Sequence, residues 1–337
     1  MGKDLKRWIV AATACATISA AVGAHAQALD EALDAPTRAH VINEFARRLT
    51  AQHVDPARAK AAADDIRQRL ARGEYDQLTT ARLLAARVTR DVAAIAPDRH
   101  TYLEYVPYDL ADERQRPQGP AQSGDNYGLG KFEMLGENIG YLQITRFAPL
   151  DRGAADAAAR FMDQAAGCAA LIVDLRDAGG DGQAMGALLS SYLLDDRRSY
   201  FFKDKQLHLH DQLDRSGRVV EEFWTSADVA GRRYGSSKPL YLLVNGRTSG
   251  AAEAFAYDLQ QYVKRAVVIG SPTAGDARVS ARQRVSRQLQ TSVAITQASN
   301  VITHANWEGM GVRPDRMVTP EQTLDGALAL AQAAVKR

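Results

Sequence analysis

The chain has 337 residues, a formal net charge of +2 and 46% hydrophobic residues. The near balance of charge gives no general reason to expect nucleic acid as a partner, and the length allows two domains with a full core. The sequence has no cysteine–histidine spacing of a zinc site, no phosphate-binding glycine motif and no dinucleotide fingerprint, so we expect neither metal nor cofactor.

Residues 1–26 have the form of a secretory signal peptide. Three cations precede an apolar stretch from Trp8 to Val22, and Ala24-His25-Ala26 has the small residues of a signal-peptidase site. The apolar stretch is short for a membrane span, so we expect a periplasmic or secreted protein without a span after cleavage. Ala14-Cys15 weakly resembles a lipoprotein cleavage site, which leaves a lipoprotein as the alternative. Cys168 would then be the only cysteine of the soluble mature chain, which excludes an internal disulfide there.

Residues 27–110 predict a small helical domain. Apolar residues recur at helical spacing in three stretches between residues 30 and 96, and Pro97 ends the third. A polar stretch with prolines and glycines follows, and we interpret 111–126 as a linker.

Residues 127–337 predict an α/β domain, because short apolar runs alternate with helical patterns in an order that is typical of parallel sheets. A hairpin is expected between 200 and 224, around Asp214-Arg-Ser-Gly217. The expected strands are 139–144, 170–175, 240–244, 266–270 and 292–296, and the expected helices are 154–164, 185–194, 251–262 and 323–335.

Ser249 lies at the predicted turn between strand 240–244 and helix 251–262. A hydroxyl there is close to amide N–H groups that have no partner within the helix, and the same amides can stabilise an oxyanion. This position suits a nucleophile. The commoner alternative is that Thr248 or Ser249 caps the helix.

Two further segments carry candidate residues. Gly179 and Gly180 follow the most apolar strand, where their amides could approach a ligand closely and bind an oxyanion, although an ordinary tight turn would also use glycine. His100 lies just beyond the end of the third predicted helix, on a segment that leads out of the helical domain. Taken alone, it would be interpreted as a surface histidine.

Six segments together resemble the tail-specific, or C-terminal-processing, serine proteases. The resemblance covers nearly all the mature chain and is greater to the branch with the interphotoreceptor retinoid-binding-protein modules and the tricorn core. The segments are Asp98-Arg-His100, Asn138-Ile-Gly-Tyr-Leu-Gln-Ile144, Asp174-Leu-Arg-Asp-Ala-Gly-Gly180, Arg247–Glu253 with Arg265–Gly275, and Asn306-Trp-Glu-Gly-Met-Gly-Val-Arg-Pro-Asp315.

The resemblance implies a ClpP/crotonase-like α/β core preceded by a small helical domain. The C-terminal-processing proteases proper use a lysine base where this chain has Asp276, so a Ser–Lys dyad is excluded, and there is no room for their PDZ domain. Tricorn-like members use serine, histidine and glutamate, and the resemblance matches His100 and Glu308 to the last two. With histidine as the base, Asp276 has no expected part in catalysis.

The nucleophile segment departs from the family pattern. Aligned without gaps, the usual nucleophile position, three residues before Glu253, holds Gly250, and Ser249 stands one residue early. Either Ser249 has taken over the role through a local shift of the turn, or the nucleophile has been lost.

Two functional hypotheses follow. The first is an exported serine endopeptidase in which Ser249 attacks the peptide carbonyl, His100 acts as the base, and Glu308 orients the histidine. Backbone amides near Gly180 and Gly250, with Gly179 beside them, would bind the oxyanion. The second is a catalytically inactive family member that binds an extended peptide or an apolar ligand. Neither needs a cofactor.

Overall fold

The computed structural model describes residues 30, 32–108, 126–136, 138–194, 202–203, 206–262 and 264–336. The expected signal peptide, 1–26, lies outside the described residues, as does the expected linker except for Asn126. The described residues form two compact units. One contains residues up to 97, 101–108 and 281–293, and the other contains 98–100, 126–280 and 294–336.

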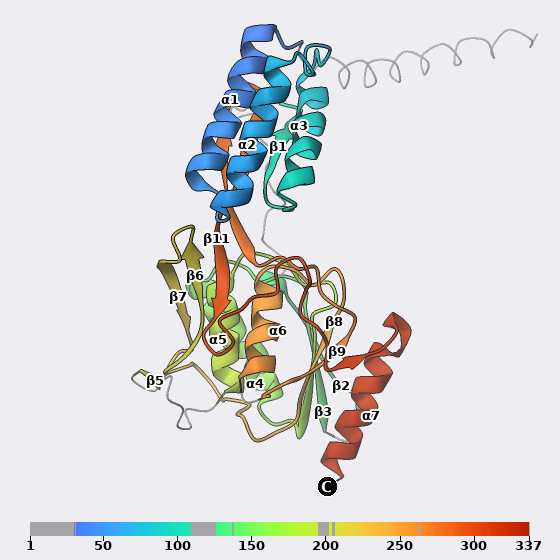
Figure 1. Ribbon diagram of the computed structural model, residues 1–337. Helices are drawn as coiled ribbons and strands as arrows, with labels where there is room; N and C mark the ends of the chain where they lie inside the picture. The colour runs from blue at the N-terminus through green and yellow to red at the C-terminus, as the bar shows by residue number, and fades with distance from the viewer. Residues whose placement is uncertain are drawn as a thin grey trace, which may run out of the picture. The chain divides into compact units, whose positions relative to one another are not determined.

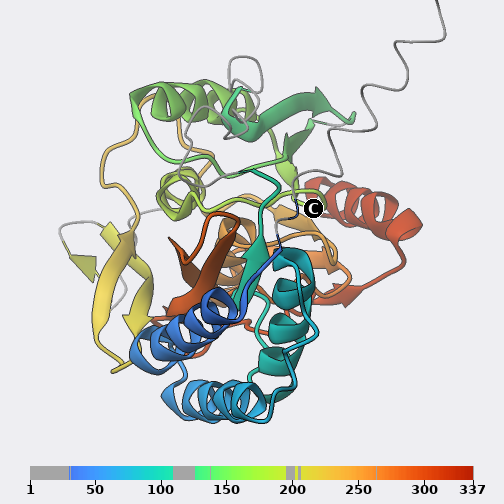
Figure 2. The same ribbon diagram turned by 90° about the horizontal axis from the view of Figure 1, so that it is seen from above.

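The helical unit consists of α1 (Ala35–Gln52), α2 (Pro56–Ala71), α3 (Ala81–Ile95) and strand β1 (Tyr102–Tyr105). Each helix begins after a residue whose side chain accepts a backbone N–H of the first turn: Asp34, Asp55 and Thr80. Such caps satisfy donors that have no partner within the helix. The three helices are the blue to teal coils of Figure 2.

Segments far along the chain complete this unit. Strands β10 (Arg278–Arg284) and β11 (Leu289–Asn300) pair with each other, and the start of β11 also pairs antiparallel with β1. Leu289 and Val293 are fully buried in one core with the apolar faces of α1 and α3. The helical N-terminal region was expected from its periodicity, but the contribution of 281–293 to it was not.

The α/β unit is built on a sheet with the strand order β12-β9-β8-β4-β3-β2. Every neighbouring pair is parallel except β2 and β3. The strands are β2 (Leu129–Met134), β3 (Ile139–Ile144), β4 (Ala170–Asp174), β8 (Leu240–Val244), β9 (Val267–Gly270) and β12 (Arg316–Met317).

Helices cover both faces of this sheet, which is why its central strands β4 and β8 are buried at every position. Leu242 and Val244 of β8 lie in the core shared with α4 (Arg152–Ala165), α5 (Gln183–Leu193) and α6 (Ala251–Gln261). Tyr241 and Leu243 face α7 (Thr323–Val335), which Figure 1 shows on the other side of the sheet. The mixed α/β core predicted from the sequence is confirmed.

The expected hairpin is also present. β6 (Gln206–Asp214) pairs antiparallel with β7 (Val219–Trp224), with the turn at Asp214–Gly217, and the short β5 (Phe202–Lys203) lies on the other side of β6. The later residues of β11 pair with the end of β6. Over the part of the chain that the structure describes, no helix combines the length and apolar character needed to cross a bilayer.

Candidate active site

The turn between β8 and α6 carries Ser249. Its amide donates to the Ala178 carbonyl oxygen (3.0 Å), so the turn is fixed to the segment that follows β4. The Thr248 hydroxyl is buried and donates to the Leu175 oxygen (2.8 Å), and so it serves the turn and does not cap the helix. Gly250 is the N-cap residue of α6, with φ 58° and ψ −124°, and its positive φ favours glycine.

Gly179 and Gly180 run beside this turn. A Cβ atom built on Gly179 would lie 2.9 Å from Ser249 Oγ, so the serine hydroxyl lies directly against Gly179. The Gly180 carbonyl oxygen accepts the Ala251 N–H (2.9 Å). The structure therefore brings Ser249, Gly179, Gly180 and Gly250 together, as the sequence motifs suggested.

The Gly180 carbonyl oxygen also occupies the space beside Gly250. A Cβ atom on Gly250 would lie only 2.5 Å from this oxygen. The Gly250 amide itself donates to Glu253 Oε2 (3.1 Å). In this arrangement the amides of Gly250 and Ala251 are both engaged, and neither is available to bind an oxyanion.

Glu253 connects the serine turn to the segment 273–276. It is fully buried in the first turn of α6, and its Oε1 accepts the Thr273 hydroxyl and the Gly275 amide. Its Oε2 accepts the amides of Gly250 (3.1 Å) and Asp276 (2.9 Å). Because these two amides bind one oxygen atom, their nitrogens lie within about 6 Å of each other.

Asp276 is the carboxylate that contacts His100. Its Oδ1 lies 2.6 Å from His100 Nε2, and both side chains are mostly shielded from solvent. The sequence alone predicts no catalytic part for Asp276, which stands where the C-terminal-processing proteases have a lysine. The two residues are 176 positions apart, so no local sequence pattern predicts their contact.

Glu308 lies in the same cluster but holds other partners. Its Oε2 accepts the Ala277 amide (2.9 Å), and its Oε1 lies 3.9 Å from Arg278 Nε. Arg278 in turn donates to Asp98 (2.7 Å), whose other oxygen accepts the His100 amide (2.7 Å). The predicted role of Glu308 in orienting the imidazole ring therefore stays a prediction.

The pKa shifts agree with this geometry. Burial lowers the pKa of His100, but the hydrogen bond to Asp276 and the charges of Asp276, Asp98 and Glu308 outweigh it and raise the pKa above its usual value. Burial is the main cause that raises the pKa of Glu308 and of Glu253, although each accepts hydrogen bonds that act against it.

Comparison with known proteins identifies the family. The sequence pattern described as Peptidase family S41 matches residues 138–318, more than half of the chain. The chain belongs to peptidase family S41. Membership of this family places the chain in the class of serine-type peptidases, as the resemblance implied.

Two solved structures with TM-scores above 0.5 share the fold of this S41 chain. A candidate peptidase from Parabacteroides merdae has 16% identity and a TM-score of 0.57, with 88% of this chain and 96% of that chain covered. A Streptococcus agalactiae lipoprotein has 11% identity and a TM-score of 0.55, covering 87% and 96%. The photosystem II D1 C-terminal processing protease has 22% identity and a TM-score of 0.44, covering 58% of this chain and 47% of that one. The S41 chain thus spans about half the length of that protease.

The sequence missed two residues of this S41 site. Glu253 follows Gly250 by three residues, the spacing of a capping box. This spacing could have predicted the contact of its side chain with the Gly250 amide. Its bonds to the segment 273–276 had no such signal. Asp276 stands at the lysine position of the related proteases, and this substitution carries no signal of its contact with His100.

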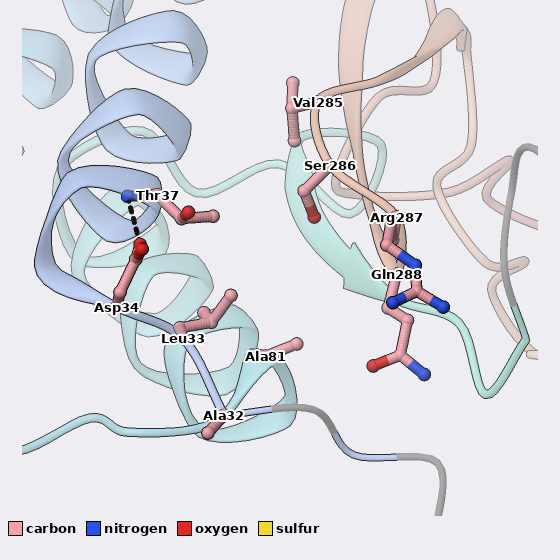
Figure 3. A pocket seen from close by; sticks show the side chains of 9 residues that line it. All are labelled: Ala32, Leu33, Asp34, Thr37, Ala81, Val285, Ser286, Arg287 and Gln288. Carbon is pink, nitrogen blue, oxygen red and sulfur yellow. Dashed lines mark hydrogen bonds between the residues drawn. The ribbon is translucent and has the colours of Figure 1, made fainter.

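A pocket of about 390 Å³ lies in the helical unit. Figure 3 shows it between the start of α1 and the turn joining β10 to β11. Asp34, its one carboxylate, already accepts the Thr37 amide as the cap of α1 (2.8 Å). None of the expected catalytic or oxyanion residues lines it; its lining is Ala32, Leu33, Asp34, Thr37, Ala81, Val285, Ser286, Arg287 and Gln288.

Proposed function

We propose that the chain is a serine endopeptidase that hydrolyses polypeptides through Ser249 and His100, and that the structure is its resting form. One observation carries the proposal: Glu253 binds the amides of both Gly250 and Asp276 through one oxygen. This brings the serine turn and the His100–Asp276 pair into a single site. A serine peptidase needs a serine hydroxyl and a base in one site.

The proposed chemistry uses the groups in this order. His100 takes the proton of the Ser249 hydroxyl as the oxygen attacks the peptide carbonyl, and the histidine then gives the proton to the leaving amine. The carboxylates of Asp276 and Glu308 favour the imidazolium that forms between these two steps. Within the described residues the Gly180 amide makes no hydrogen bond, which makes it our candidate oxyanion donor.

One contact must change before this chemistry can occur, and a change in a second would add an oxyanion donor. The His100 Nε2 atom is engaged by Asp276, so the ring must turn or release this contact to act on Ser249. The Gly180 carbonyl must leave the Ala251 amide for this amide to bind an oxyanion. We propose that an extended peptide bound along 178–180 makes both changes.

The second candidate function is peptide binding without hydrolysis. It is favoured by Gly250 at the family's nucleophile position, where the Gly180 oxygen fills the space of a side chain. In that case the Asp276–His100 pair would be the permanent arrangement of a site that has lost its nucleophile.

Labelling with a serine-directed fluorophosphonate separates the two. We expect the parent to be labelled and to hydrolyse casein, and the Ser249→Ala variant to lose turnover by roughly 10⁴–10⁶, since members of such a triad act as a unit. Ser216→Ala, in the exposed turn between β6 and β7, is the matched control and should keep the parent rate. An unlabelled, inactive parent would favour the binding function, and an active Ser249→Ala variant would contradict both.

We also propose that the protein is exported to the periplasm or secreted. The support is the signal-like sequence of residues 1–26. N-terminal sequencing of the protein recovered from its own compartment should begin at Gln27, and recovery with Met1 intact would contradict export by cleavage.

A further inference from the structure

We propose that the hairpin of β6 and β7 carries a binding site for one transition-metal ion, with Zn²⁺ as its test ligand. The ligands would be His208, Asp211 and Glu222, whose ligand atoms all lie within 4.8 Å of one another. This site lies outside the candidate active site and needs none of its residues.

A β-bulge places the three side chains on one face. His208 and Asp211 are three residues apart, and in a regular strand an odd spacing would put them on opposite faces. The register of β6 against β7 shifts after His208, so that His208 faces Trp224 and Asp211 faces Glu222. Because Trp224 and Glu222 are two residues apart, all four side chains share a face.

The side chains are already held near one another. His208 Nε2 lies 2.7 Å from Asp211 Oδ1, and its ring stacks on Trp224 with centroids 4.1 Å apart and an angle of 6°. Glu222 Oε2 accepts the Trp224 indole N–H (3.0 Å). The imidazole and both carboxylates are thus positioned by contacts that do not depend on a metal.

The charges favour a cation at this place. Two carboxylates lie close together here, and in the described part of the chain neither Asp211 nor Glu222 forms an ion pair with lysine or arginine. Many of the other carboxylates pair with arginine, as Asp214 does with Arg218. A divalent cation would offset the repulsion between Asp211 and Glu222.

The donor set indicates which metal would bind. One imidazole nitrogen with two carboxylates suits Zn²⁺ and its neighbours, whereas Ca²⁺ takes six to eight oxygen ligands. Ligands at about 2.1 Å from zinc lie about 3.4 Å apart at the tetrahedral angle, so the exposed Glu222 must move by roughly 1–2 Å. With Nε2 of His208 as the ligand, Nδ1 would carry the ring proton, and water would complete the coordination.

Trp224 supplies a signal for the test. Untagged protein freed of metal by a chelator is titrated with ZnCl₂, with calorimetry and tryptophan fluorescence as readouts. We expect one ion per chain, a change in emission and a higher melting temperature. Trp224→Phe should lose the emission change and keep the calorimetric binding. CaCl₂ at the same concentrations should produce no response.

Single variants decide the assignment. Glu222→Gln, at an exposed position that should not affect folding, and His208→Gln should each weaken zinc binding at least about tenfold, the loss expected when a metal site is disturbed. His40→Gln, an exposed histidine on α1, is the matched control and should bind like the parent. The proposal is overturned if the parent shows no saturable binding of one ion, if either ligand variant binds zinc as the parent does, or if Ca²⁺ binds equally well.

Discussion

Two neighbouring positions, Ser249 and Gly250, determine what chemistry the turn after β8 can perform. The hydroxyl at 249 lies against Gly179, while position 250 has the left-handed backbone and is closed by the Gly180 oxygen. A one-residue displacement of a hydroxyl along a tight turn changes its direction completely. The site therefore depends on whether Ser249 can reach His100 once the Gly180 peptide moves.

Returning a serine to position 250 tests this point. Gly250→Ser should lower the free energy of unfolding by roughly 1–3 kcal/mol, because the side chain meets both a positive φ and the Gly180 oxygen. It should not raise turnover above the parent level. Gly217→Ser is the control, because its φ of 80° is similar and open space surrounds it, so only the backbone cost applies. Urea unfolding and a casein assay measure both effects. A gain of hydrolysis in Gly250→Ser would instead show that the parent site had lost its nucleophile.

The pH dependence of activity reports on the His100–Asp276 pair. A general base must be neutral, and the pKa of His100 is raised, so kcat/KM should fall on the acid side with a midpoint above about 6.5, the usual histidine value. Asp276→Asn removes the main cause of the rise but leaves the burial, so the midpoint should move to lower pH. Glu308→Gln should move it less, because the Glu308 charge is the weakest of the causes that raise the pKa. An unchanged midpoint in Asp276→Asn would mean that His100 is not the titrating base.

At the scale of elements, the start of α6 is joined to 273–276 through Glu253. This carboxylate is fully buried and accepts hydrogen bonds from three backbone amides and one hydroxyl. Glu253→Gln would place an NH₂ group opposite donors and leave amides without acceptors, which should cost about 2–4 kcal/mol. Glu133→Gln, exposed on β2, should stay within about 0.5 kcal/mol of the parent. Urea unfolding compares them, and equal losses would show that Glu253 does not hold the two segments together.

The elements were largely predictable, and the contacts between them were not. The strands at 139–144 and 240–244 and the helix at 323–335 have the predicted bounds, because an apolar run or a helical repeat is a local property. The pairing of His100 with Asp276 joins two loops that are far apart in sequence. Charge and spacing within either loop contain no information about the other.

At the scale of the whole molecule, the helical unit is built from segments that are not continuous in the chain. The sequence predicts the helical domain from one continuous stretch, but its core also contains Leu289 and Val293. Arg48 of α1 donates to the Gln283 oxygen (3.0 Å) and to Thr291 Oγ1 (2.8 Å). Composition along the chain could not reveal this, because 281–293 follows the α/β pattern without a break.

A fragment of the chain tests whether the helical unit needs the segment 281–293, which contains the turn between β10 and β11. Residues 30–108 alone should be helical by circular dichroism but should unfold in urea without a cooperative transition. The fragment lacks two fully buried side chains, each worth about 1.5–3 kcal/mol on burial, and two acceptors of Arg48, the Gln283 oxygen and Thr291 Oγ1. Joining 278–293 to it through a flexible linker should restore a cooperative transition. The same fusion with Leu289→Ala and Val293→Ala should behave like the bare fragment, because it keeps the backbone and loses only the two core side chains. If the bare fragment unfolds as cooperatively as the fusion and at the same urea concentration, the α1–α3 core is sufficient by itself, and 281–293 only covers it.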